Sequence, residues 1–298
     1  MIDDSATVHS AESTLKDYDR PSLTTDITAF TIRKEEEKNY RKLPVYHLSI
    51  LMVRRSEDPY NGYWSLPGGF VTRNESVTEA AARILKRETG IEESYLALAD
   101  IAGEQGRDPR GWVVSAAYWT LLEQNRLPAV PAAESGDPVQ WFDVSYTRAD
   151  HTVQTDANSC HSLDTWQLVL TSEEETLKAT VRVRRESNLY NETVNCELIS
   201  CDKIAFDHAV LIARSVFQLR HSVSDTPVAF KLLPEEFTLT ELQKVYEVIL
   251  DTPLLMANFR RKMAPYVLET DRFAPSGGYH PPKLFRRNLS AFMPSEMK

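Results

Sequence analysis

Apolar and polar residues alternate along the first half of the chain in segments that predict strands on either side of one helix. Residues 75–89 repeat apolar side chains at helical spacing, and Gly90 follows as a suitable helix C-cap. Strands placed around one helix predict an α/β sandwich over residues 23–146. The expected strands are 25–32, 46–53, 113–122 and 139–144.

Polar stretches separate these segments. Residues 1–22 are polar and predict a loose N-terminal arm, and the charged residues 33–42 predict a solvated loop. Pro67, Gly68 and Gly69 predict a sharp turn.

Residues 147–205 have a different pattern. Residues 151–164 are mostly polar, and the alternation that follows predicts a half-buried antiparallel face. This segment is interpreted as an inserted β-rich element or linker, with no function assigned. Its expected strands are 166–170, 177–184 and 196–199.

From residue 206 to residue 298 the pattern is first helical. Helices are expected over 207–219 and 238–250, and Thr238 with Glu241 matches a capping box for the second of them. Thr252 and Pro253 then predict the start of a third helix through residues 259–263, after a gap of only two or three residues. Two helices joined so tightly indicate a helix-turn-helix. A turn at 276–278 and a basic strand at 281–287 complete a possible wing.

The segment from Gly69 to Ile91 holds Glu75, Arg83, Glu88 and Gly90 at fixed spacings. This motif resembles the Nudix box. That family's pattern is Gly, five residues, Glu, seven residues, Arg-Glu, an aliphatic residue, any residue, Glu-Glu, any residue, Gly and an aliphatic residue. The resemblance implies a Nudix-type α/β/α sandwich, here with an inserted β element and a winged helix-turn-helix domain after it. The match spans 23 residues and holds at Gly69, Glu75, Arg83, Leu85, Glu88, Gly90 and Ile91.

Two positions of that pattern are replaced, by Ile84 and Arg87. Positions 84, 87 and 88 share one helix face, where a hydrolase of the family has three carboxylates. Magnesium prefers oxygen ligands, and a guanidinium about 4 Å from a divalent ion would repel it by several kcal/mol at intermediate dielectric. The sequence therefore predicts no metal, no cofactor and little or no hydrolysis, with Glu75, Arg83 and Glu88 as remnants of the box.

The remaining carboxylates leave an alternative open. Glu75 and Glu88 persist, and Glu92, Glu93 or Glu104 could assist them. The alternative is a magnesium-dependent Nudix hydrolase acting on ADP-ribose or another nucleoside diphosphate derivative.

Residues 18–22 and 106–118 resemble segments of Nudix-related transcriptional regulators and of their ADP-ribose pyrophosphatase relatives. Further segments resemble the winged-helix domain of those regulators, at 205–209, 232–243, 258–262 and 278–285. The resemblance implies a repressor of NAD or sugar metabolism genes, an effector such as ADP-ribose or a sugar derivative, and a homodimer bound to a palindromic operator in double-stranded DNA. The segment 147–205 departs from the family pattern.

Candidate ligand contacts lie in and around the box. Arginines suit a pyrophosphate, aromatic rings suit a base, and glycines let the backbone approach a ligand closely. Some of these residues could equally be surface charges or core aromatics, and Arg83 could brace the helix by pairing with Glu88. The candidates are Arg54, Arg55, Trp64, Gly68, Gly69, Phe70, Arg107 and Arg110, with Trp112 as a further aromatic.

Candidate DNA contacts lie in the basic part of the tail. In a helix-turn-helix the second helix enters the major groove, where arginine pairs with guanine and asparagine with adenine. Phe259 and Met263 are expected to face the core instead. The candidates are Asn258, Arg260, Arg261 and Lys262 on the helix, and Lys283, Arg286 and Arg287 on the wing.

Charge and cysteine content refine the picture. The net charge is −9, yet residues 207–298 hold twelve Lys and Arg against ten Asp and Glu, a charge of +2, so residues 1–206 carry −11. The three cysteines fit no zinc or redox spacing and are expected to be reduced. No apolar run is long enough for a membrane helix and no signal peptide is evident, which favours the cytoplasm. A protein-interaction module remains the third alternative, but the third helix is more basic than apolar.

Overall fold

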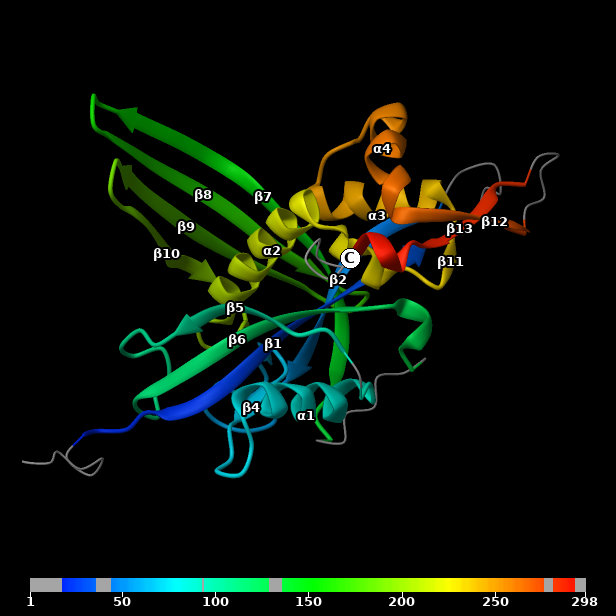
Figure 1. Cartoon of the computed structure of the whole chain (residues 1–298). Helices are drawn as coiled ribbons and strands as arrows, with labels where there is room; N and C mark the ends of the chain where they lie inside the picture. Colours follow the sequence, from blue (N-terminus) through cyan, green and yellow to red (C-terminus); the bar gives the residue numbers. More distant parts are fainter. Residues whose placement is uncertain (1–17, 36–43, 93, 129–135, 276–280, 293–298) are drawn as a thin grey trace, which may run out of the picture.

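The structure is organised around one large mixed β-sheet (Figure 1). The computed structural model describes residues 18–35, 44–92, 94–128, 136–275 and 281–292. Within these residues the sheet has ten strands, of which eight follow the order β10-β9-β8-β7-β2-β1-β6-β5, while β3 pairs with β2 and β4 with β1. The strands are β1 (Ser22–Glu35), β2 (Val45–Arg54), β3 (Trp64–Ser65), β4 (Gly68–Phe70), β5 (Ala97–Ala102), β6 (Val113–Leu122), β7 (Val139–Thr155), β8 (Ser159–Thr171), β9 (Thr176–Asn188) and β10 (Glu192–Cys201).

Strand β1 lies at the centre of this sheet. It pairs in parallel with β6 and antiparallel with β2 and β4. Residues 24–31 are buried without a break, because helices cover both faces of the sheet here. The pairing of β4 with β1 corrects the expected turn at Pro67, Gly68 and Gly69, since the two glycines form an extended strand.

One face of the sheet is covered by helix α1 (Val77–Thr89). Ser76 caps its first turn in a capping box with Glu79, and Gly90 ends it in the left-handed conformation at φ 73°. Its buried side chains pack against β1 and β6 in a separate apolar cluster. The predicted helix is confirmed, although it begins at Val77 rather than Glu75.

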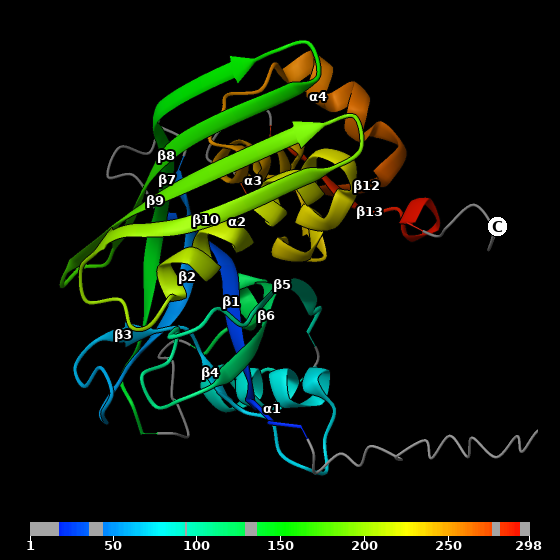
Figure 2. The ribbon, with the colours of Figure 1, turned by 90° about the vertical axis from the view of Figure 1, so that its left-hand side faces the viewer.

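The opposite face is covered by helix α2 (His208–Asp225), which Figures 1 and 2 show lying along the sheet. A continuous apolar cluster runs from this face through α2 into the C-terminal helices. The expected α/β/α sandwich is therefore present. Helix α2 is 18 residues long, and no helix in the described part of the chain is both long and apolar enough to cross a membrane.

Residues 147–205 extend the same sheet. Strand β7 begins on β2 and continues to Thr155, so it crosses the boundary expected at residue 146. The polar residues 151–164 belong to the β7–β8 hairpin, which corrects the expectation that strand structure starts only at residue 166. Polar side chains fit there because the far end of β7 is exposed on both faces, and the paired end of β8 is mostly half-buried.

The C-terminal part forms a winged helix. Thr238 and Glu241 make the expected capping box at the start of α3. The third helix begins at Met256 with Leu255 as N-cap, which corrects the start expected at Thr252 and Pro253: Asp251 ends α3 in a left-handed conformation, and residues 251–255 form a longer turn. The elements are α3 (Leu239–Leu250), α4 (Met256–Met263) and a small sheet of β11 (Glu236–Phe237), β13 (Lys283–Arg287) and β12 (Val267–Phe273), with short 3-10 turns at Gln124–Arg126, Pro227–Leu232, Ala264–Tyr266 and Leu289–Phe292. The expected wing turn at 276–278 falls outside the described residues.

Candidate functional site

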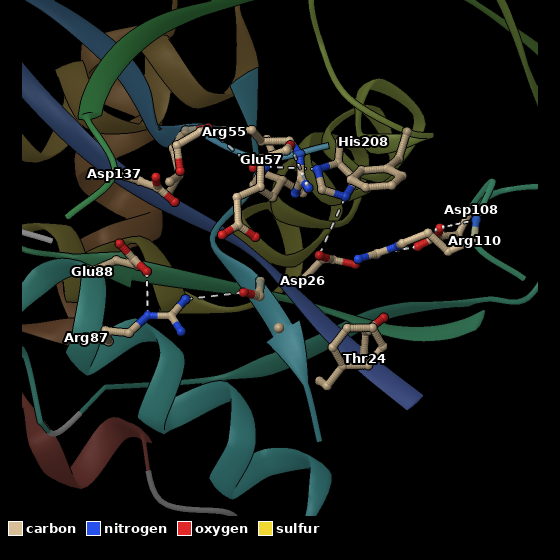
Figure 3. Close-up of a pocket in the computed structure, with 18 of the residues that line it drawn as sticks. Thr24, Asp26, Arg55, Glu57, Arg87, Glu88, Asp108, Arg110, Asp137 and His208 are labelled. Carbon is tan, nitrogen blue, oxygen red and sulfur yellow. Dashed lines mark hydrogen bonds and ion pairs between the residues drawn. The ribbon is translucent and has the colours of Figure 1, made fainter. Parts of the chain in front are cut away.

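A cavity of about 330 Å³ opens between α1, β4 and the segment that leads into α2 (Figure 3). Its lining carries four arginines, five carboxylates and one histidine, so it is polar and mixed in charge. The charged and imidazole side chains are Arg55, Arg87, Arg107, Arg110, Asp26, Glu57, Glu88, Asp108, Asp137 and His208.

The helix face on which the Nudix pattern places three carboxylates carries Ile84, Arg87 and Glu88 instead. Ile84 is fully buried, and a Cβ placed on Gly69 would lie 3.3 Å from its Cδ1, so the aliphatic side chain packs directly beneath the glycine backbone. Arg87 Nε donates to Glu88 Oε1 at 2.6 Å, and its second nitrogen donates to the Gly68 carbonyl at 3.3 Å. These residues do not fit a hard divalent cation, because the Arg87 guanidinium already binds the two oxygen ligands on offer, the Glu88 carboxylate and the Gly68 carbonyl.

Arg83 and Glu75 form a brace beside the cavity. Arg83 makes two hydrogen bonds to the Glu75 carboxylate, at 2.9 and 2.7 Å, and a third to the Phe70 carbonyl at 3.2 Å. The two bonds from Arg83, together with one from the Thr72 amide, lower the pKa of Glu75 to about 2. The expected partner Glu88 is thus corrected to Glu75, and the brace ties α1 to the strand that precedes it.

The floor of the cavity is a buried polar network. Ser115 Oγ donates to Asp26 Oδ2 at 2.5 Å, and His208 Nε2 lies 3.5 Å from Asp26 Oδ1. The Leu66 amide donates to His208 Nδ1 at 2.9 Å, so the imidazole carries its proton on Nε2. Gly68 is required beside this network because any Cβ there would collide with Asp26 Oδ1.

Burial determines the protonation state of that histidine. Desolvation lowers the pKa of His208, and the positive charges of Arg107 and Arg55 act in the same direction, whereas Asp26 and Asp207 oppose it. His208 is therefore neutral at pH 7, which matches its role as acceptor from a backbone amide.

Three of the predicted arginines line the cavity. Arg107 is almost fully buried and makes two hydrogen bonds to Asp207, at 2.9 and 2.8 Å. Arg110 pairs with Asp108 but keeps 43% of its side chain exposed. Arg55 donates to the Pro59 carbonyl at 2.8 Å. Gly68, Gly69 and Phe70 also line the cavity, as expected.

Arg54 and Trp64 lie outside this cavity, which corrects their place among the candidates. Arg54 ends strand β2 just before Arg55, so its side chain points to the other face and donates to the Gly62 carbonyl. Trp64 is 2% exposed in the core, where its indole N–H donates to Glu175 Oε1 at 2.7 Å. Trp112 is exposed and belongs to a different surface hollow.

Phe206 lines the cavity but was not among the ligand contacts predicted from the sequence. Its ring lies 5.0 Å from the Arg55 guanidinium carbon and 5.7 Å from that of Arg110, and its backbone has a φ of 55°. The signal was present, because segment 205–209 matched the regulator pattern, but it was attributed to the DNA-binding half. His208 lies in the same segment as Phe206, whereas Asp26 gave no usable signal, since it is a single carboxylate in an otherwise ordinary strand.

Helix α4 presents the predicted basic residues to solvent. Phe259 and Met263 are buried as expected. Asn258, Arg260 and Arg261 are exposed and make no side-chain hydrogen bond or ion pair within the described residues. Lys262 instead donates to the Ser224 carbonyl of α2 at 2.8 Å.

The predicted wing residues are engaged inside the winged helix. Arg286 makes two hydrogen bonds to Glu236, Lys283 pairs with Glu269 at 2.7 Å, and Arg287 donates to the Leu233 carbonyl. Burial lowers the pKa of Arg287. The three side chains therefore bond to neighbouring segments of the winged helix, and among its described residues Arg260 and Arg261 of α4 stay exposed without such a bond.

Comparisons with known proteins agree with this architecture. The NUDIX domain model matches residues 32–162, and the NrtR DNA-binding winged helix domain model matches residues 229–287. Fold and site thus define a Nudix-type domain joined to a winged helix DNA-binding domain. The chain belongs to the Nudix-related transcriptional regulators built in this way, with an NrtR-type winged helix at the C-terminus.

Individual relatives show how far the similarity reaches. The chain is 28% identical over 280 residues to the ADPR-responsive transcriptional repressor NtrR of Acinetobacter baylyi, covering 93% of this chain and 86% of that protein. It is 41% identical over 96 residues to an ADP-ribose pyrophosphatase of Methanocaldococcus jannaschii, covering 32% of this chain and 55% of that enzyme.

Solved structures share the whole fold. A MutT/nudix family protein from Enterococcus faecalis superposes with a TM-score of 0.62 at 24% identity, covering 93% of this chain and 90% of that one. Shewanella oneidensis NrtR superposes with a TM-score of 0.59 at 24% identity, covering 91% and 95%.

Proposed function

We propose that this chain is a transcriptional repressor that binds an operator in double-stranded DNA and responds to ADP-ribose. The observation that carries the proposal is the presence, in one chain, of an arginine-lined Nudix cavity without a carboxylate triad and an exposed basic helix in a winged helix domain. The Acinetobacter baylyi relative, which aligns with 93% of the chain, is an ADPR-responsive repressor.

The cavity offers the charge that a diphosphate requires. Burial and the neighbouring positive charge of Arg110 lower the pKa of Arg55. An anion placed between the two guanidinium groups would relieve that repulsion and accept hydrogen bonds from both. Phe70, which is 48% exposed and lies under Arg110, provides a flat surface for a base or ribose.

Helix α2 connects this cavity to the DNA-binding helix. Its N-terminal end carries His208 and follows Phe206 and Asp207, all of which belong to the cavity or to its buried ion pairs. Near its C-terminal end, Arg220 donates to the Ile249 carbonyl of α3 at 2.9 Å, and the Ser224 carbonyl accepts from Lys262 of α4. A ligand that shifts the first turn of α2 therefore acts on the helix that holds α4.

The direct test measures DNA affinity with and without ADP-ribose. Duplexes are first selected by the protein from a random pool, and the Kd is then measured by fluorescence anisotropy at fixed salt. We expect ADP-ribose to change the Kd at least severalfold, while AMP alone, which lacks the second half of the ligand, has a weaker effect. An unchanged Kd at saturating ADP-ribose would contradict the proposal.

Matched arginine variants assign the two binding sites. Arg55→Gln should weaken ADP-ribose binding about tenfold to a hundredfold, because a charge-assisted hydrogen bond is worth about 1.5–3 kcal/mol. Arg54→Gln, one residue away and outside the cavity, should leave the affinity unchanged.

For DNA, the double variant Arg260→Ala with Arg261→Ala should abolish specific binding.

The matched control for DNA removes the same charge elsewhere. Arg182→Ala with Arg184→Ala takes one half-buried and one exposed arginine from β9 of the large sheet. If this control loses as much DNA affinity as the α4 variant, the reading role of α4 is wrong, since the loss would follow net charge alone.

The alternative function is hydrolysis of ADP-ribose, which the 41% identity to a pyrophosphatase over 96 residues favours. Glu75 and Glu88 remain, but each is held by an arginine at 2.9 Å or less. We infer that turnover is slow or absent. The measurement is AMP release from ADP-ribose with magnesium or manganese, and turnover at ordinary enzyme rates, of about 1 per second or more, would restore the hydrolase.

The proposal also covers the oligomeric state, the regulated genes and the location of the protein. We infer a homodimer, control of NAD or sugar metabolism genes, and a cytoplasmic location, all from the family resemblance. Light scattering of the purified chain tests the first, and mapping of bound genomic fragments tests the second.

A further inference from the structure

A second cavity, of about 270 Å³, lies between α2 and the inner face of strands β7–β10. It shares no lining residue with the first cavity. Aromatic side chains from three elements and two arginines shape it, together with one thiol. These residues are Tyr146, Trp166, Phe217, Arg185, Arg214 and Cys196.

Aromatic side chains form two sides of this cavity. Tyr146 and Trp166 stack with ring centroids 4.7 Å apart and planes at 17°. Phe217 enters from α2 and keeps 45% of its surface exposed. Surfaces of this kind favour a planar ring, which stacks on them or meets their edges. The volume lies just below the range typical of drug-sized ligands, which limits the occupant to one ring or two fused rings.

Arg185 supplies an unused cationic group on the same face. Its guanidinium carbon lies 4.8 Å from the Phe217 ring centroid. Its Nε is buried and has no hydrogen-bond acceptor within the described residues, and no carboxylate there lies within ion-pair distance. A buried donor without an acceptor costs about 1–3 kcal/mol, so the position favours any molecule that brings an acceptor.

The other polar groups of the cavity leave this charge uncompensated. Asp100 is engaged by Arg214, which also lies 3.6 Å from Glu104. Burial raises the pKa of the Cys196 thiol, which is therefore neutral at pH 7. The cavity combines a net positive charge with aromatic walls. This combination favours a ligand that consists of an aromatic ring with an anionic substituent.

We propose that this cavity binds a small planar aromatic carboxylate, with the carboxylate on Arg185 and the ring against the Tyr146–Trp166 pair. Arginine pairs with a carboxylate through two parallel hydrogen bonds, which satisfies the buried Nε. The occupant contacts α2 at Phe217, in the middle of the helix that begins at the first cavity. The site thus offers a second ligand contact on the same helix.

The test uses 4-fluorobenzoate as the probe and fluorine NMR as the measurement on the full chain. We expect saturable binding, weakened at least tenfold by Arg185→Gln. Arg184→Gln is the matched control, because the neighbouring residue on β9 points to the opposite, exposed face and should bind as the wild type does. The neutral isostere 4-fluorobenzamide should bind at least tenfold more weakly, and Phe217→Ala should weaken binding even if Arg185→Gln fails to fold.

Several results would overturn the inference. These are no saturable binding at millimolar probe, equal loss in Arg184→Gln and Arg185→Gln, or equal affinity for the benzamide. If ADP-ribose displaced the probe and Arg185→Gln bound the probe as the wild type does, the probe would lie in the first cavity instead. None of these outcomes depends on whether the chain represses transcription.

Discussion

Acidification should destabilise the folded chain through His208. Burial lowers the pKa of this imidazole in the folded state, where Asp26, Asp207, Arg107 and Arg55 are the charged groups that face it. The unfolded chain keeps the ordinary value near 6.5. As the pH falls through the pKa of the unfolded state, the unfolded chain binds a proton that the folded chain does not bind. The free energy of unfolding therefore decreases.

The size of the effect follows from linkage. One proton bound only by the unfolded state changes the free energy of unfolding by about 1.4 kcal/mol per pH unit. Between about pH 7.5 and about pH 5.5, His208 therefore removes at most about 1.4 kcal/mol, because half of that interval lies above the ordinary pKa. Salt does little to reduce the effect, since the dominant cause is desolvation rather than a distant charge.

Urea unfolding at several pH values measures this contribution. His208→Asn places a carbonyl oxygen where Nδ1 accepts from the Leu66 amide, and it cannot titrate. It should be less stable at neutral pH and should lose less stability on acidification. His221→Asn, at a histidine that is 69% exposed, should behave as the wild type does. If His208→Asn kept the full pH dependence of the wild type, the argument from the buried imidazole would be refuted.

Three further predictions follow from the packing. Phe259→Ala should lower the free energy of unfolding by about 3–5 kcal/mol, seen in the thermal midpoint, because the ring is buried against Tyr246 at 5.3 Å. Gly68→Ala should weaken ADP-ribose binding and cost about 1–3 kcal/mol of stability, since its Cβ collides with Asp26; calorimetry and urea unfolding measure the two. Lys262→Ala should bring the DNA Kd values measured with and without ADP-ribose closer together, because it removes the bond between α4 and α2.

Local signals made part of the fold predictable. Helix α1 was recognisable because its apolar spacing and Gly90 act over a few neighbouring residues. The same holds for the capping box of Thr238 at α3. Strand β4 was mistaken for a turn because Gly68 and Gly69 are extended only through pairing with β1, more than forty residues earlier in sequence.

Side-chain direction limited the prediction of the site. Arg54 and Arg55 are equivalent in sequence, and only the pleat of the strand decides that Arg55 alone reaches the cavity. On the wing, Arg286 looked like a free cation, yet Glu236 from a strand fifty residues away in sequence neutralises it. Such pairings depend on tertiary contacts that no local pattern encodes.

Helix α2 explains why the cavity and the winged helix belong to one structural unit. His208 at its start accepts a bond from Leu66, 142 residues earlier in sequence, and Arg220 near its end binds the last turn of α3. Because its buried side chains belong to one apolar cluster with the sheet and the C-terminal helices, α2 cannot shift at one end without repacking at the other. A ligand that displaces His208 or Phe206 therefore changes the position of α4 by moving one rigid element, and no chain of small side-chain adjustments is required.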